Sequence, residues 1–153
     1  MSTPALDALA AAGLRHQVVE HGPVRSLDEA AALGVAVPDV VKTLVVRRGD
    51  DDYLFVLVPG DRVISWPRLR ALLGVNRLSL PDADTAKAVT GYERGAITPF
   101  GATTRWPVVA DERIRGRTIT LGTGRHGTAV LVEADAALAA LAATLADITD
   151  PAD

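Results

Sequence analysis

Runs of apolar residues divide the chain into predicted strands and helices. Residues 40–46 and 53–58 are rich in β-branched and apolar side chains, and the polar sequence RRGDDD lies between them. This pattern predicts a β-hairpin, and its nearly continuous hydrophobicity indicates two strands in the middle of a sheet. Further strands are predicted at residues 17–20, 108–110, 118–121 and 128–132.

Helices are predicted where a capping residue precedes an apolar run and a glycine follows it. Thr3 and Pro4 begin a helix that ends at Gly13, because threonine accepts a bond from a free amide and proline fits the first turn. Ser26 and Glu29 have the capping-box spacing and predict a second helix that stops at Gly34. The remaining predicted helices cover residues 65–73, 81–89 and 135–145, the last an Ala/Leu-rich amphipathic segment.

The order of these elements predicts the fold class. Strands and helices interleave without a regular βαβ alternation, which favours an α+β (mixed α/β) fold with a mixed, largely antiparallel sheet flanked by helices. With 153 residues and no internal repeat, the chain has the size of one domain. We therefore expect a single domain over residues 1–153.

Composition narrows the classes of function. The chain has no cysteine, which excludes disulfides, thiolate metal sites and a cysteine nucleophile. No apolar run is long enough to span a bilayer, so we expect a cytoplasmic protein with no membrane partner. The net charge of −3 argues against nucleic-acid binding through overall positive charge, although a local arginine patch stays open beside the alternative of solvated surface charges.

Three familiar site types find no support in the sequence. Residues 122–127 read GTGRHG and match the dinucleotide-binding pattern, but a strand-like segment follows where that motif needs a helix, so we interpret them as a hairpin turn. His16, His21 and His126 lack metal-ligand spacing, and no serine lies in a nucleophile-elbow sequence. We therefore expect no cofactor and no metal.

Two other features are candidates for chemistry. Lys42 lies in the apolar sequence VVKTLVV, where an ammonium is costly without a partner, unless it sits at the start of the strand and reaches water. Residues 91–101 carry three glycines and a proline, which suits a rigid main-chain cradle for a carbonyl or oxyanion. The alternative for this segment is an ordinary long connection.

Taken together, these features resemble a known family. Lys42 in VKTLVV is followed by GAITPFG at residues 95–101, then by DERI and by the glycine turn GTGRHG. This order is similar to that of the YbaK/ProX editing domains, which occur free-standing and inserted in prolyl-tRNA synthetases. The similarity covers roughly residues 14–145, with Gly95 and Pro99 matching the family's G-x-x-x-P loop.

The resemblance implies a function, partners and site residues. It implies hydrolysis of a small amino acid such as Ala, Ser, Cys or Pro from the 3′ end of a mischarged tRNA, with a tRNA synthetase as a further partner. Lys42 would contact the substrate near the ester or the terminal phosphate, and water would attack with help from the ribose hydroxyl. The substrate-binding residues that the resemblance implies are His21, Leu27, Gly95, Ala96, Ile97, Thr98, Pro99, Gly101 and Gly122.

One departure from the family pattern affects the substrate. Members with a serine in the glycine turn would place it near Gly122, which leaves the preferred amino acid open. Pockets separate amino acids that differ by one methylene by only about 1–3 kcal/mol. Two alternatives to a hydrolase remain, a non-catalytic module that binds an aminoacyl or nucleotide end, and an unrelated small-ligand domain.

Overall fold

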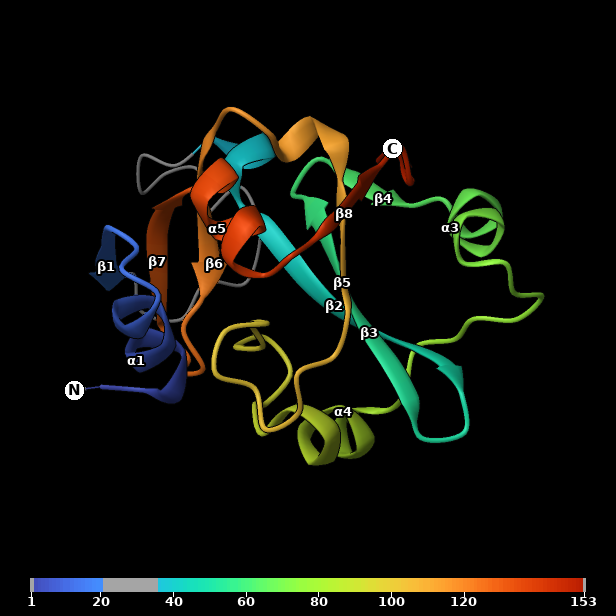
Figure 1. Ribbon diagram of the computed structural model, residues 1–153, viewed down its shortest axis with the longest axis horizontal. Coiled ribbons are helices and arrows are strands. Elements are labelled where there is room, and N and C mark those ends of the chain that lie inside the picture. Colours follow the sequence, from blue (N-terminus) through green and yellow to red (C-terminus); the bar gives the residue numbers. More distant parts are fainter. Residues whose placement is uncertain (1, 21–35, 153) are drawn as a thin grey trace.

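Two β-sheets meet beside strand β2 (Figure 1), in a computed structural model that describes residues 2–20 and 36–152. The larger sheet has the order β2-β3-β5-β8, in which β2 and β3 are antiparallel and the two other pairs are parallel. Its strands are β2 (Val41–Gly49), β3 (Asp52–Pro59), β5 (Val108–Asp111) and β8 (Thr144–Ala146).

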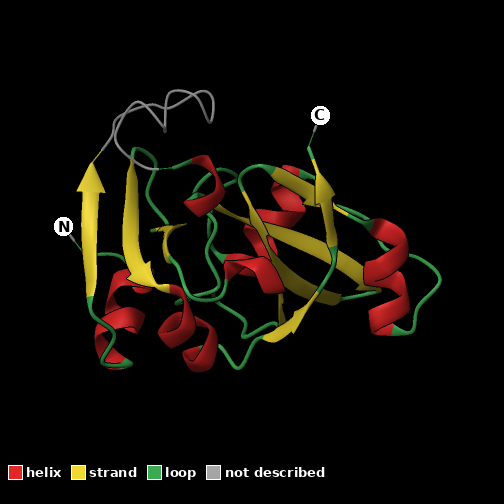
Figure 2. Ribbon diagram, turned by 90° about the horizontal axis from the view of Figure 1, so that it is seen from above, coloured by secondary structure: helices red, strands yellow, loops and turns green. Residues whose placement is uncertain are grey.

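The smaller sheet is antiparallel and has the order β1-β7-β6. Its strands are β1 (His16–Glu20), β6 (Thr118–Gly122) and β7 (Thr128–Glu133). A single parallel bridge between Val40 and Thr120 connects it to β2. Viewed from above, the two sheets occupy opposite ends of the molecule (Figure 2).

Strand β3 is the centre of the core. Its residues from Tyr53 to Pro59 are all buried, and alternate side chains enter two different apolar clusters. Phe55 packs with side chains of β6 and β7, whereas Val56 packs with Leu69 and Ile148 on the opposite face. Burial on both faces explains why this strand has a nearly continuous apolar sequence.

The helices cover these faces, and α1 and α4 have side-chain caps at their N-termini, whereas Ser65 before α3 makes no cap hydrogen bond. In α1 (Pro4–Ala11) the Thr3 hydroxyl accepts from Leu6 N at 3.2 Å, and in α4 (Ala83–Thr90) Asp82 accepts from Thr85 N at 2.8 Å. Helix α3 (Trp66–Leu73) ends at Gly74 in a left-handed conformation. A short pair, β4 (Arg62–Ile64) with β9 (Thr149–Pro151), closes the molecule beside α3.

The predicted final helix over residues 135–145 is wrong in its second half. Helix α5 (Ala134–Ala140) ends early, Ala142 adopts a positive φ of 51°, and residues 144–146 form β8. Strand β8 pairs in parallel with β5 and completes the larger sheet. The strong helix propensity of Ala and Leu is therefore overridden by sheet pairing that the local sequence does not record.

Most other predicted elements are confirmed. The hairpin, the strands at 108–110, 118–121 and 128–132, and the mixed, largely antiparallel architecture all occur, and GTGRHG is a turn between β6 and β7. In the larger sheet, however, β2 is an edge strand and not a central one. The predicted helix that stops at Gly34 lies outside the described residues.

The helices of this structure are short, none longer than eight residues among those described. Within residues 2–20 and 36–152, no helix combines the length and the apolar character that a bilayer span requires.

Candidate functional site

A pocket of about 350 Å³ opens where β2 and β6 separate beyond the bridge between Val40 and Thr120. Its walls come from β2, from β6 and β7, from the start of α4, and from residues 91–101, which we call the glycine loop. Lys42 thus shares a pocket with Gly95, Ile97 and Gly122, although these residues are far apart in the sequence.

The main chain of β2 faces this pocket. Arg47 N donates to Ser79 O at 2.8 Å and Ser79 N donates to Arg47 O at 3.1 Å, so the polar groups of Arg47 point away from β3. Because every second residue of an antiparallel strand points the same way, those of Thr43 and Val45 also point away from β3. No strand pairing among the described residues covers Thr43 or Val45 on that side.

Thr43 adds a polar side chain to this edge. Its Oγ1 is buried and has no hydrogen-bond partner within the described structure, although the residue lines the pocket. A buried hydroxyl without a partner costs about 1–3 kcal/mol, so such groups are uncommon. Because Thr43 lines an open pocket, a change of its rotamer would let the hydroxyl bond to a molecule bound there.

The ammonium of Lys42 is held and only partly compensated. Lys42 Nζ donates to Arg62 O at 2.9 Å, which leaves two of its three N–H donors for other acceptors. Burial lowers the pKa of Lys42 from its ordinary value of 10.5, and the nearby Asp61 carboxylate opposes that shift. Lys42 lies near the start of β2, lines the pocket and is half-buried, so its charge carries a desolvation cost.

The glycine loop is fixed by one hydrogen bond between its ends and by another at its middle. The Tyr92 hydroxyl donates to Phe100 O at 2.7 Å, and burial raises the pKa of Tyr92 to about 12. The amide of Gly124, in the β6–β7 turn, donates to Ala96 O at 2.9 Å. The loop is therefore a closed structure and differs from an ordinary flexible connection.

A histidine and a glutamate join the same loop to the same turn. His126 Nε2 lies 3.1 Å from Glu93 Oε2, and hydrogen bonds from His126 and Lys87 lower the pKa of Glu93. The His126 ring lies next to Gly95, with Cε1 3.4 Å from where a Cβ would stand. Gly95 itself has a φ of +93°, which a side chain would strain.

Gly122 determines how closely the loop approaches β6. A Cβ at this position would stand 2.8 Å from Ile97 O and 3.0 Å from Ala96 O. The serine expected in some family members therefore has no room here unless the loop moves. Because both carbonyls face Gly122, the amides of Ile97 and Thr98, which belong to the same trans peptide units, point the other way.

Those two amides are candidate donors. No described residue accepts a hydrogen bond from Ile97 N or Thr98 N, whereas Ala96 N donates to Glu93 O at 2.9 Å. Free main-chain donors in a rigid, partly dry loop are the usual elements of an oxyanion site. Of these two residues, Ile97 lines the pocket and Thr98 is fully buried, so Ile97 N is the candidate donor on the pocket side.

The remaining predicted site residues do not line the pocket in the described structure. Ala96 and Thr98 are buried within the loop, and Pro99 and Gly101 line a different hollow on the far side. Gly101 has a φ of +68°, and a Cβ there would stand 2.3 Å from Pro4 O, so its role is to let the loop pack on α1. His21 and Leu27 lie outside the described residues.

Titratable groups are few in this pocket. The lining residues include two cations, Lys42 and Arg94, and no carboxylate or imidazole among those that the structure describes. The described ranges also contain no cluster of three His, Asp or Glu side chains that could bind a metal ion. Reactivity in this pocket would thus depend on positive charge, on main-chain donors and on the bound molecule itself.

Comparison with known proteins identifies the family. The model of the aminoacyl-tRNA editing domain family matches residues 21–139. The chain belongs to this family. The match confirms the resemblance drawn from the order of the lysine, the glycine loop and the glycine turn.

Sequence relatives of this editing domain include bacterial proline–tRNA ligases. The enzyme of Thermosipho africanus is 34% identical over 93 residues, which cover 60% of this chain and 16% of the ligase. That of Desulfovibrio desulfuricans is 34% identical over 115 residues, covering 75% of this chain and 18% of the ligase. The matched regions are therefore a small part of these ligases.

A solved structure has the same fold over nearly the whole editing domain. The crystal structure of "a putative trans-editing enzyme for prolyl tRNA synthetase" superposes with a TM-score of 0.86 and 27% identity. The match covers 98% of this chain and 99% of the other. The two chains thus match over nearly their whole lengths.

Sequence reasoning missed several residues of the editing-domain pocket. Arg94 belongs to the glycine loop and lines the pocket, but the sequence pattern indicated only the residues that follow it. Its position directly before Gly95 could have indicated a cation at the site. Thr43 follows Lys42 directly and could have been noted as a polar residue in an apolar strand. Leu80 and Pro81 also line the pocket, and nothing in their local sequence indicates it.

Proposed function

We propose that this editing domain hydrolyses the ester bond of mischarged aminoacyl-tRNA and releases a small amino acid. The observation that carries the proposal is the shared pocket, in which Lys42, Gly95 and Ile97 line one space. Family membership supplies the class of substrate, and the pocket supplies groups suited to a phosphate and an ester.

Each group would have a distinct role in the reaction. Lys42 and Arg94 would anchor the terminal phosphate or an ester oxygen, because both are cations that line the pocket. The amide of Ile97 would stabilise the oxyanion that forms when water attacks the carbonyl carbon. The open edge of β2 at Thr43 would contact the aminoacyl group.

The proton that leaves the attacking water needs an acceptor. The described lining residues provide no carboxylate and no imidazole. The ribose hydroxyl next to the ester is a group that the substrate brings with it, and it can position the water and relay the proton to the leaving ribose oxygen. Holding these groups in one geometry can supply much of the rate enhancement.

Deacylation of a panel of charged tRNAs tests this proposal. Transfer RNAs carrying Ala, Ser, Cys, Pro and Thr are incubated with the protein, and the released amino acid is followed over time. Selective turnover of one or two species is expected, and Lys42→Ala should reduce that rate at least tenfold, equivalent to about 1.4 kcal/mol, with an unchanged melting curve. An unchanged rate in Lys42→Ala would remove the lysine from the mechanism.

A second candidate is a non-catalytic module that holds an aminoacyl end alongside a synthetase. The observation that favours it is the same lack of a described acid or base in the pocket. A binding module would raise the melting temperature with an aminoacyl-adenosine analogue and release no amino acid from any charged tRNA. Multiple turnover on the panel would exclude it.

A further inference from the structure

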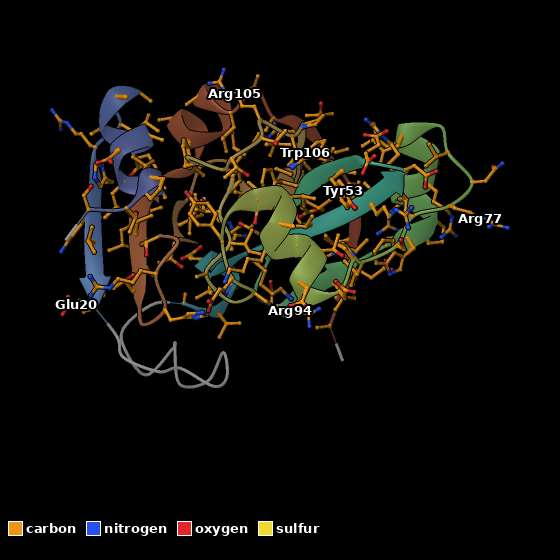
Figure 3. The ribbon with its side chains drawn as sticks, turned by 90° about the horizontal axis from the view of Figure 1, so that it is seen from below. Glu20, Tyr53, Arg77, Arg94, Arg105 and Trp106 are labelled. Carbon is orange, nitrogen blue, oxygen red and sulfur yellow. The ribbon has the colours of Figure 1, made fainter. Side chains whose placement is uncertain are left out.

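A second polar hollow lies at the other end of β2. It has a volume of about 620 Å³, and four arginines line it, two from the β2–β3 hairpin and two from α3 and the segment that follows α3. We call it the arginine hollow, and its arginines are Arg47, Arg48, Arg70 and Arg77. Figure 3 shows Arg77 extending outward at the end of the molecule that carries α3.

Two of these arginines are already paired with the acidic turn of the hairpin. Arg47 Nη2 lies 2.6 Å from Asp50 Oδ1, and Arg48 contacts both carboxylate oxygens of Asp52 at 3.1 Å. The Asp50 side chain is 98% exposed, and exposed pairs of this kind contribute only about 0–1 kcal/mol. An incoming anion could therefore compete for Arg47 at little cost.

The two other arginines carry the net positive charge of the hollow. Arg70 and Arg77 form no ion pair with any residue in the described ranges. In a chain with a net charge of −3, a group of four arginines around one concave surface is a local exception. Guanidinium groups bind phosphate oxygens through two parallel hydrogen bonds, so phosphate is the anion that this surface fits best.

The arginine hollow and the substrate pocket adjoin along one strand. The pocket is lined by residues 40–45 of β2 and the hollow by Arg47 and Arg48, while Leu80 and Ser79 line the pocket and the hollow respectively. The bridge between Arg47 and Ser79 separates the two. From Thr43 to Arg48 the strand advances about 17 Å, at about 3.3 Å per residue.

That distance is comparable to the length of a few stacked nucleotides at the end of a nucleic acid. Stacked nucleotides advance about 3.4 Å per step, so about 17 Å corresponds to roughly five nucleotides. A tRNA whose terminal ester occupies the pocket would bring the backbone of its unpaired 3′ end and first acceptor-stem pairs to such a distance. The spacing therefore matches a phosphate contact made by the same tRNA.

We propose that the arginine hollow binds the acceptor-stem phosphates of the tRNA whose aminoacyl end enters the pocket. Arg70 and Arg77 are the principal contacts, and Arg47 and Arg48 exchange their hairpin carboxylates for phosphate oxygens. This proposal rests on the proposed function for the identity of the RNA. It explains how a chain with negative net charge can hold a polyanion, because attraction is confined to one end of the molecule.

Binding of uncharged tRNA tests the hollow separately from catalysis. Fluorescence anisotropy with a labelled acceptor-stem minihelix is measured at several salt concentrations for the wild type and for the double variant Arg70→Gln/Arg77→Gln. The variant should bind about tenfold more weakly, and the slope of log K against log salt should fall by about two, because each removed guanidinium neutralises about one phosphate. The matched control is Arg15→Gln/Arg105→Gln, which removes the same charge from two exposed arginines outside both cavities of β2.

Comparison of two substrates adds a kinetic test. For the hollow variant, kcat/KM should fall about tenfold on full-length charged tRNA and less than twofold on a short aminoacylated CCA oligonucleotide that cannot reach the hollow. Equal reductions for the hollow variant and the control, or an unchanged salt slope, would overturn the proposal. If the wild type binds the minihelix with the expected salt slope but deacylates no tRNA, the hollow stands and the proposed reaction fails.

Discussion

Replacing Thr43 with valine separates a role in substrate binding from a role in the fold. Valine has nearly the same shape, so the change removes the Oγ1 hydroxyl, which is buried without a partner in the described structure. An unsatisfied buried hydroxyl costs about 1–3 kcal/mol, and valine should recover part of this cost, about 1 kcal/mol. For a chain of this length the melting temperature should rise by about 2–4 °C.

Activity should move in the opposite direction. If a change of the Thr43 rotamer lets the hydroxyl bond to the aminoacyl group, its removal should lower kcat/KM between about twofold and tenfold, the range for one net hydrogen bond. The assays are thermal unfolding and deacylation of the preferred charged tRNA. A stabilised variant with full activity would refute the substrate contact, and a destabilised variant would show that the hydroxyl has a partner in the folded protein.

Thr90→Val is the matched control for this experiment. The Thr90 hydroxyl is also buried, but it donates to Ala86 O at 2.7 Å and accepts from Tyr92 N at 3.1 Å. Its removal leaves Tyr92 N without this partner and should lower the free energy of unfolding by about 1–2 kcal/mol. The two threonines should thus give melting-temperature shifts of opposite sign.

Two further predictions concern the close approach at Gly122 and the charge of Lys42. Gly122→Ala places a methyl group 2.8 Å from Ile97 O, so it should lower the free energy of unfolding by about 1–3 kcal/mol and lower the deacylation rate as the glycine loop moves. The control is Gly49→Ala, whose methyl would be 3.9 Å from Asp52 Cβ and should leave the melting temperature nearly unchanged. Equal stability of both variants would contradict the geometry. Burial lowers the pKa of Lys42 and Asp61 opposes this, so the affinity for a non-hydrolysable, amide-linked aminoacyl-adenosine analogue should fall as pH rises through a value below 10.5. Asp61→Asn removes the opposing charge and should move that fall to lower pH. Calorimetric titration across pH measures the affinity, and a fall at the same pH in Asp61→Asn would contradict the electrostatic coupling.

Local sequence was sufficient for elements whose pattern and burial agree. Strand β3 was predicted because a strand buried on both faces must be apolar throughout, and α1 and α3 were predicted from their caps and glycine stops. Strand β8 could not be found this way, because Thr144–Ala146 follows an Ala/Leu-rich helix and becomes a strand only by pairing with β5. The edge position of β2 likewise depends on where β6 separates from it.

The candidate site was predictable where a residue conflicted with its surroundings. Lys42 stood out as a charge in an apolar strand, and the glycine loop stood out by its composition. Within the loop, however, composition could not tell which residues line the pocket. The structure places Gly95 and Ile97 on the pocket side and Pro99 and Gly101 on the opposite hollow, a division set by the φ of +68° at Gly101 and its packing on Pro4.

The divergence of two strands accounts for the chemical character of the pocket. Where β2 leaves β6, its main-chain groups at Thr43 and Val45 lose a sheet partner, and the glycine loop fills the space with further main-chain donors. Such a pocket has many fixed dipoles and two cations, Lys42 and Arg94, but no described carboxylate or imidazole in its lining. It is suited to an ester, which needs stabilisation of developing negative charge more than a strong nucleophile. The same argument predicts that single substitutions in this pocket reduce deacylation without abolishing it, since no one side chain carries the reaction.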